Sequence, residues 1–397
     1  MKKGFIYTII IIVLIAILGG MIYLLGKSDN NGTSNNSGAT TVNTVSGSIY
    51  SSSDIFTTRD LTQTADLDVA KNYTVSDDND ILITEEGVYV LTGTAKNVTI
   101  YVEAGDEDKI QLVLDGLNIT NDNFPCIYVK TADKVFVTLT STDNTLTVSG
   151  SFTADGSTNT DGVIFSRSDI TLNGTGNLTI KSTDNGIVGK DDIKVTGGNY
   201  TIIVTSKAIE ANDSICIMDG TFILKAGTDG LHAENEDDNS LGYIYIDGGE
   251  FTITAGDDGI HSQTVVQIDD GTITITASEG IEGTYIQING GTININGNDD
   301  GINAANKSNA YKTTIEINGG DIKIVMASGD TDGIDSNGDI YVNGGTIDVT
   351  GNSTFDYDGT AEFNCGTIIV NGIQVDTIPN QMIGGGNKGG NRGGKGF

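Results

Sequence analysis

The sequence predicts an all-β protein folded as a right-handed, single-stranded parallel β-helix, and two observations lead to this prediction. First, an acidic residue followed by Gly, and later by a Gly-Gly turn, recurs through the second half of the chain with a period of roughly 20 to 30 residues. Second, β-branched and polar residues alternate within each copy, as in TITITA at residues 272–277. A period of two is typical of half-buried strands, and a fixed repeat of this length indicates a solenoid.

Each copy has room for three short strands and leaves none for a helix. In the copy that starts at Asp258, one strand follows the acidic-Gly pair, one ends at the glycine turn, and one ends before the next acidic residue. The alternating Ile and Val side chains are expected to fill the interior of the stacked coils. A β-sandwich is the rival architecture, but it does not require copies this similar.

The N-terminal segments predict attachment to a membrane. Residues 1–27 carry two lysines and then an apolar run long enough to span a bilayer, which predicts a signal anchor. A cleaved signal peptide is the alternative. Residues 28–54 are rich in Ser, Asn and Gly and are expected to form a flexible linker. We therefore expect a single-pass cell-membrane protein with its C-terminal domain outside the cell; secretion is the alternative.

The rest of the chain is assigned to the β-helix and a tail. The solenoid is expected over residues 55–380, with irregular opening coils at 55–150 and regular coils at 151–372. Residues 381–397 form a Gly-rich, basic tail, expected to be disordered.

Composition restricts the partners. The chain has 53 acidic and 21 basic residues, a net charge of −32, which argues against nucleic-acid binding. Its three cysteines are far apart and form no CxxC motif, so they predict neither a disulfide framework nor a zinc site. We expect a monomer.

Stacking of the copies turns one sequence position into a row of acidic side chains. The position before the repeated Gly holds six acids in consecutive copies: Asp229, Asp258, Glu279, Asp300, Asp332 and Asp358. At a coil spacing of about 4.8 Å, two such charges repel by roughly 1 kcal/mol in water and roughly 3.5 kcal/mol at a dielectric constant of 20. Hard cations would relieve this repulsion, and Ca²⁺ suits irregular oxygen cages. We therefore predict Ca²⁺ ligands at Asp229, Asp257, Asp258, Glu279, Asp299, Asp300, Asp332, Glu282 and Asp335. A solvated row of turn-forming acids is the alternative.

Three further rows stand out. Two residues after the repeated Gly lie the only histidines, His232 and His261, which are expected to be neighbours and to ligate a cation, to hydrogen-bond a ligand or to form an ordinary polar ladder. An outward row on the second strand contains Tyr245 and Tyr341 with Gln and Glu, a composition that suits sugar binding. We predict carbohydrate contacts at these two histidines and two tyrosines, and no catalytic residue. A row of Asn before the Gly-Gly turn is assigned to the fold.

Several stretches together resemble a known family. They are Gly87–Ala104, Gln111–Thr138, Asp229–Asn235, Asp257–Ile260, Glu279–Ile293, Gly329–Gly338 and Ser353–Asn364. They look like the extracellular carbohydrate-binding domain proteins of anaerobic Gram-positive bacteria, over nearly all of residues 56–372. The resemblance implies a parallel β-helix related in shape to pectate lyases. It also implies bound calcium and binding of plant-wall polysaccharides such as polygalacturonate and cellulose, without established catalysis.

The predicted function is binding of an acidic plant-wall polysaccharide at the cell surface. Polygalacturonate and this chain are both anionic, so the contact needs bridging cations. A calcium-dependent pectate lyase is one alternative and requires a basic residue near the metal, for which Lys190, Lys207 and Arg167 are the candidates. A structural surface adhesin is the second alternative.

Overall fold

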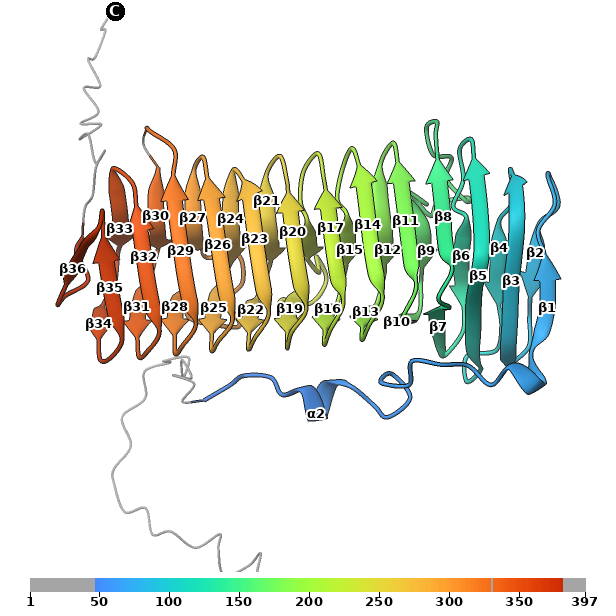
Figure 1. Cartoon of the computed structure of the whole chain (residues 1–397), viewed down its shortest axis with the longest axis horizontal. Coiled ribbons are helices and arrows are strands. Elements are labelled where there is room, and N and C mark those ends of the chain that lie inside the picture. The colour runs from blue at the N-terminus through green and yellow to red at the C-terminus, as the bar shows by residue number, and fades with distance from the viewer. Residues whose placement is uncertain (1–46, 330, 381–397) are drawn as a thin grey trace, which may run out of the picture. The chain divides into compact units, whose positions relative to one another are not determined.

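The computed structural model describes residues 47–380 except residue 330, and these residues form a solenoid of stacked parallel strands (Figure 1). The prediction of a parallel β-helix with three strands in each regular coil is confirmed. The predicted signal anchor, most of the linker and the Gly-rich tail lie outside the described residues. Within residues 47–380, no helix has the length and hydropathy that a membrane span requires.

The first strand of each coil belongs to a 12-stranded parallel sheet. Its strands are β2 (Ile81–Ile83), β4 (Ile100–Glu103), β6 (Ile127–Thr131), β9 (Gly162–Ser166), β12 (Asn185–Gly189), β15 (Ile209–Ala211), β18 (Leu231–Ala233), β21 (Asp258–Ser262), β24 (Glu279–Gly283), β27 (Asp300–Ala304), β30 (Asp332–Ser336) and β33 (Ser353–Tyr357).

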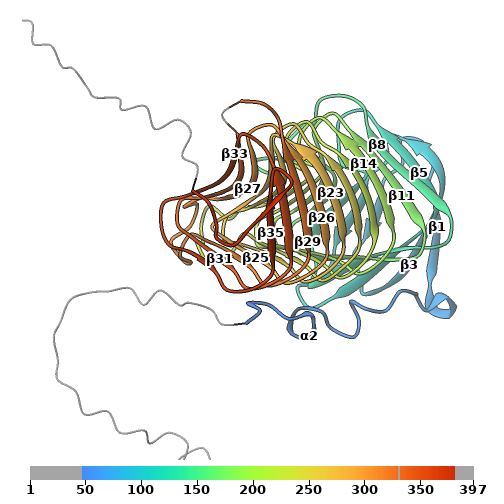
Figure 2. The same ribbon diagram turned by 60° about the vertical axis from the view of Figure 1, so that its left-hand side comes forward.

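The second and third strands belong to a 24-stranded sheet that bends around the coil (Figure 2). The second strands are β7 (Lys134–Leu139), β10 (Asp169–Gly174), β13 (Asp192–Val195), β16 (Ser214–Ile217), β19 (Tyr243–Ile246), β22 (Val265–Ile268), β25 (Tyr285–Ile288), β28 (Thr314–Ile317), β31 (Asp339–Val342) and β34 (Ala361–Phe363). The third strands are β8 (Asp143–Val148), β11 (Asn177–Ser182), β14 (Asn199–Val204), β17 (Thr221–Lys225), β20 (Glu250–Thr254), β23 (Thr272–Ala277), β26 (Thr292–Gly297), β29 (Asp321–Met326), β32 (Thr346–Thr350) and β35 (Thr367–Val370).

The two ends of the solenoid depart from this pattern. At the first end, the early strands of the larger sheet are β1 (Lys71–Thr74), β3 (Gly87–Lys96) and the long β5 (Lys109–Asn121), which pairs with both β7 and β8. At the other end, β36 (Ile373–Val375) turns back and pairs antiparallel with β35.

The interior is a continuous stack of aliphatic side chains. Ile273 and Ile275 of β23, for example, lie in register with Ile293 and Ile295 of β26, and all four are at most 1% exposed. The repeated Gly is required where coils approach closely: a Cβ at Gly280 would lie 2.3 Å from the carbonyl oxygen of the next coil's glycine. The acidic-Gly pair thus fixes the turn into the 12-stranded sheet.

The Asn row forms the predicted hydrogen-bonded ladder. The side-chain Nδ2 of Asn318 donates to Oδ1 of Asn289 at 2.8 Å, and Asn343 donates to Asn318 at 2.8 Å. Asn364 continues the ladder by donating to Asn343 at 2.9 Å. These amides stabilise the turn that joins the second and third strands.

The segment of residues 47–66, here called the strap, corrects two predictions. It contains α2 (Ser52–Ile55), and the 3₁₀ helix η1 (Leu67–Val69) follows it before the first strand, Lys71–Thr74. The strap runs along the outside of the second strands (Figure 1), whereas the sequence predicted a flexible linker to residue 54 and coils from residue 55. Polar pairs hold it in place, as shown by Tyr50 N to Gln267 Oε1 at 2.7 Å and by Lys134 Nζ to Asp60 Oδ1 at 2.8 Å.

One register prediction also needs correction. Asp332 pairs with Ser353, so Asp358 does not continue the acid row. The row therefore contains five acids in consecutive coils, and its last coil is entered by a Ser-Thr pair in place of acid and Gly.

Candidate functional site

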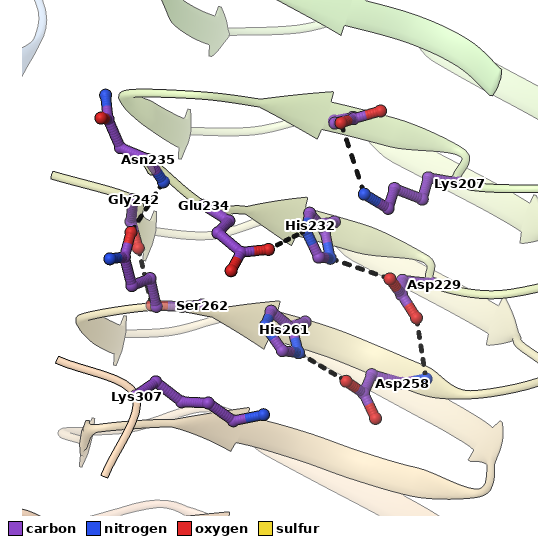
Figure 3. A network of polar contacts seen from close by, with 12 residues as sticks. Lys207, Asp229, His232, Glu234, Asn235, Gly242, Asp258, His261, Ser262 and Lys307 are labelled. Carbon is purple, nitrogen blue, oxygen red and sulfur yellow. Dashed lines mark hydrogen bonds and ion pairs between the residues drawn. The ribbon is translucent and has the colours of Figure 1, made fainter. Parts of the chain in front are cut away.

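Two histidines stack on neighbouring coils, on the side of the 12-stranded sheet that faces away from the aliphatic interior (Figure 3). In the pairing of β18 with β21, His232 lies opposite His261; their ring centroids are 4.5 Å apart and their planes differ by 13°. Each histidine follows the row acid by three positions, in Asp229–His232 and Asp258–His261, so the two coils repeat one local geometry. The prediction that the histidines are neighbours is confirmed.

Carboxylates flank both ring nitrogens of His232. Its Nδ1 lies 2.8 Å from Oδ2 of Asp229, and its Nε2 lies 3.3 Å from Oε2 of Glu234. The contact with His232 is the main reason that the pKa of Glu234 is lowered to about 2. Burial would raise the pKa of Asp229, but the hydrogen bond and charge of His232 outweigh it and hold that pKa below its usual value.

His261 is bound by two carboxylates on the same nitrogen. Its Nδ1 lies 2.6 Å from Oδ2 of Asp258 and 2.9 Å from Oε2 of Glu282. Burial alone would lower the pKa of His261, but these carboxylates raise it to about 9. Lys307, which comes from a polar insertion two coils away from His261, reaches Glu282 Oε1 at 2.9 Å. Burial would raise the pKa of Glu282, but the hydrogen bonds from His261 and then Lys307 lower it.

Glu279 and Asp300 of the acid row, and Asp335 beside it, have acidic rather than basic neighbours. Burial, followed by repulsion from neighbouring acids, raises the pKa of Glu279 to about 7, of Asp300 to about 8 and of Asp335 to about 6. Within the described part of the chain, no Lys, Arg or His forms an ion pair with these three carboxylates. Asp229 and Asp258 thus pair with histidines, whereas Glu279, Asp300 and Asp335, here called the unneutralised half of the row, need protons or cations.

Three sets of metal-binding side chains converge, with the potential ligand atoms of each set within 4.8 Å of one another. They are His232 with Glu234 and His261, Asp258 with His261 and Glu282, and Asp169 with Asp191 and Asp192. The predicted ligands Asp258 and Glu282 belong to one set. The other predicted ligands lie along the row without joining such a set: Asp229, Asp257, Glu279, Asp299, Asp300, Asp332 and Asp335.

The third set was missed by sequence reasoning. Asp169 and Asp192 precede the first Ile of two consecutive second strands, and this recurring acid is the signal that the sequence contains. Burial and the charges of Asp192 and Asp191 raise the pKa of Asp169 to about 6. Comparing that position across copies would have revealed the paired acids.

A cavity of about 570 Å³ opens beside His232. Its lining includes Lys190, Lys207 and Glu210 from the coils before His232 and the insertion that starts at Glu234. That insertion is anchored because Asn235 donates its backbone N–H to Gln263 Oε1 at 2.7 Å. Two of the three basic residues that the sequence offered for acid–base chemistry therefore share a cavity with a histidine.

The two predicted sugar-stacking tyrosines differ in access. Tyr245 is 0% exposed, because Tyr50 and Phe56 of the strap pack against it with ring centroids 6.2 and 6.4 Å away. The second-strand face, predicted to be open, is covered by the strap at this point, so the ring of Tyr245 offers no surface to a sugar. Tyr341 is half-buried, and its hydroxyl donates to Asp339 Oδ2 at 3.0 Å.

The stacked parallel sheets, with an acid row and a lysine-containing cavity on the outer surface, define the class of this protein as a parallel β-helix solenoid. The family model described as carbohydrate-binding domain-containing protein matches residues 77–285 and 277–365. This match covers more than half of the 397 residues, so the chain belongs to that family.

Two relatives agree with this assignment. A carbohydrate-binding domain-containing protein of Acetivibrio thermocellus (strain ATCC 27405) is 40% identical over 125 residues, which is 30% of this chain and 44% of that protein. The aligned part thus spans less than half of that relative. A solved structure of a polysaccharide lyase-like protein from C. thermocellum, a gadolinium derivative, is 32% identical with a TM-score of 0.50, over 56% of this chain and 96% of that one.

Proposed function

We propose that this protein binds acidic plant-wall polysaccharide, of the polygalacturonate type, through calcium ions held on the acid row of its β-helix. The proposal includes the right-handed coil related to pectate lyases, the N-terminal membrane anchor and an extracellular location of the solenoid. The observation that carries it is the unneutralised half of the row, where the pKa of Asp300 is raised to about 8.

The residues in this half fit a hard cation. Glu279, Asp300 and Asp335 offer carboxylate oxygens on successive coils, and Oδ1 of Asn303 is buried without a hydrogen-bond partner among the described residues. Carboxylate and amide oxygens are the ligands that calcium prefers, in flexible geometries of six to eight oxygens. A calcium ion there would neutralise the row and could offer open positions to uronate carboxylates. The gadolinium derivative of the solved relative adds support, because gadolinium, like calcium, is a hard cation.

Electrostatics explains why calcium would be needed for this ligand. The chain carries a net charge of −32 and the polymer is a polyanion, so direct contact is repulsive. A neutral glycan such as cellulose would not need the bridge. The calcium dependence of binding therefore separates acidic from neutral ligands.

Affinity electrophoresis of the full-length chain, through gels containing polygalacturonate with calcium or with chelator, tests the proposal. We expect retardation only with calcium, and its loss in Glu279→Gln/Asp300→Asn. The matched control is Asp169→Asn/Asp192→Asn, which removes the separate carboxylate set and is expected to keep retardation. Equal retardation in calcium and chelator at moderate ionic strength would contradict the calcium bridge.

A second candidate function, calcium-dependent lyase activity, is favoured by the cavity. Lys190 and Lys207 line it together with His232, and Lys207 Nζ is held 3.3 Å from Glu210 Oε1. A base positioned near a bound uronate could take the proton next to its carboxylate. Ultraviolet absorbance of unsaturated uronides, absent in Lys207→Ala, would establish this activity; no absorbance from wild-type protein with calcium would exclude it for the polymer tested.

A further inference from the structure

The histidine pair presents a type of site that differs from the acid row. Both histidines of the chain lie side by side, and the ligand atoms of His232, His261 and Glu234 are within 4.8 Å of one another (Figure 3). The side chains of His232 and His261 are only 8% and 11% exposed, whereas the side chain of Glu234 is 51% exposed. Two nitrogens and one carboxylate therefore meet at the edge of the cavity, where a solvent ion can reach them.

The carboxylates behind the rings fix their orientation. Asp229 lies at Nδ1 of His232, and Asp258 and Glu282 lie at Nδ1 of His261. Each ring therefore has Nε2 as the nitrogen directed away from its row acid, and Glu234 already meets Nε2 of His232 at 3.3 Å. A carboxylate on one ring nitrogen is the usual outer partner of a metal-binding histidine, because it fixes the tautomer and makes the other nitrogen a better ligand.

The donor set selects the class of cation. Imidazole nitrogens favour zinc and neighbouring transition metals, whereas calcium and magnesium favour oxygen ligands alone. Two histidines, one carboxylate and one open position also form the ligand set of known zinc sites.

We propose that His232, His261 and Glu234 form a binding site for a divalent transition metal of the zinc class, with a fourth position open to the cavity. Nitrogen–zinc bonds of about 2.0 Å in tetrahedral geometry bring two nitrogens to about 3.3 Å. The ligand atoms of the set lie within 4.8 Å of one another and the ring centroids are 4.5 Å apart, so the two rings are within about 1 to 1.5 Å of this separation.

Metal binding here would act on the cavity. Glu234 is the first residue of the insertion that forms the cavity wall, so a metal bond would fix that wall to two coils of the solenoid. The open fourth position would face the cavity and could accept an oxygen of a bound ligand. This site is independent of the calcium row, whose unneutralised half starts at Glu279.

Zinc titration calorimetry on the full-length chain, without a histidine tag, in nonionic detergent and excess calcium tests the proposal. All proteins carry Cys365→Ser, because that cysteine is exposed and could bind zinc on its own. We expect one zinc ion per chain. The zinc affinity should be at least ~100-fold weaker in His232→Gln and in His261→Gln. It should be ~10 to 100-fold weaker in Asp229→Asn, which changes only the carboxylate behind the His232 ring. Cobalt(II) added as a spectroscopic probe should show tetrahedral visible absorption that His261→Gln abolishes.

The matched control is Asp237→Asn, an acidic residue of the same insertion that lines the same cavity and belongs to none of the three convergent sets. Its zinc affinity should equal that of the parent. Glu234→Gln changes an exposed side chain, so it keeps the test valid if a histidine variant does not fold; we expect it to weaken zinc at least ~10-fold. Zinc affinity unchanged in folded His261→Gln or in Glu234→Gln, or no zinc binding by the parent, would overturn the proposal. Retention of calcium-dependent polygalacturonate retardation in Glu234→Gln, a residue outside the acid row, would separate this site from the proposed function.

Discussion

Replacing Asp300 by Asn removes the carboxylate whose pKa rises most along the unneutralised half of the row, from 3.8 to about 8. Between about pH 4 and pH 8 the folded protein keeps a proton that the unfolded chain has lost. Unfolding then releases protons, so without calcium the stability of the wild-type protein falls as the pH rises through this window.

The magnitude follows from the shift. From pH 5 to pH 8 the proton difference spans about three pH units, which corresponds to about 4 kcal/mol at 1.4 kcal/mol per unit. Asp300 is half-buried, so solvent screening reduces this to about 2 kcal/mol. In chelator, the free energy of unfolding of Asp300→Asn minus that of wild type should therefore be about 2 kcal/mol larger at pH 8 than at pH 5. In calcium at pH 8 the sign should reverse, because the variant loses a calcium ligand.

Thermal melts of both proteins at the two pH values, in chelator and in calcium, provide the assay. Asp257→Asn, which removes one exposed negative charge next to the row, is the control for the change in net charge in chelator. Equal melting temperatures of wild type and Asp300→Asn at pH 8 in chelator would refute the argument. A variant stabilised equally at both pH values would also refute it.

Three further perturbations test the fold. Asp60→Asn leaves Lys134, which is 8% exposed, without its ion-pair partner. We therefore expect the free energy of unfolding to fall by about 3 kcal/mol and proteolysis within residues 47–66 to become faster. Asp54→Asn, at an exposed position, is the control. Asn318→Ala removes two ladder hydrogen bonds and should cost about 1 to 2 kcal/mol in urea unfolding, whereas Thr254→Ala on an exposed strand position should cost much less. Gly280→Ala should cost more than about 3 kcal/mol, because its Cβ would lie 2.3 Å from the carbonyl oxygen of Gly301; Gly283→Ala, whose nearest contact is a Val266 methyl at 3.3 Å, is the matched control. A melting temperature of Gly280→Ala equal to that of Gly283→Ala would contradict the close-approach explanation.

The repeat made most of the fold predictable. Alternating Ile and Thr in β23 fixed its strand character, and the acidic-Gly pair fixed the coil start, so the adjacency of His232 and His261 followed from register alone. The predicted register is wrong at the last coil. Asp358 precedes a Gly as the row acids do, but the first strand of that coil starts at Ser353.

The strap could not be predicted in this way. Its residues are mostly polar and carry no repeat, and their partners lie far away in the sequence: Gln267, the partner of Tyr50, is more than 200 residues from it. Gln267 and Gln287 belong to the outward row that contains Tyr245, and their side-chain amides donate to carbonyl oxygens of the strap backbone.

The charge balance of the site also needed the structure. The sequence presented the row acids as equivalent, yet the two histidines and Lys307 neutralise only its first half. Lys307 comes from an insertion whose path no repeat specifies. Burial acts on both Asp229 and Asp300, but the hydrogen bond and charge of His232 hold the pKa of Asp229 low, whereas neighbouring acids add to the rise of the Asp300 pKa.

Titration of a galacturonate oligosaccharide into the full-length chain, first saturated with calcium and then treated with chelator, tests the central claim most directly. The account predicts binding heat with calcium and none after chelation. Restoring calcium should restore the binding heat of wild type, whereas Glu279→Gln/Asp300→Asn should give no binding heat even with calcium. Binding of equal affinity after chelation would contradict it.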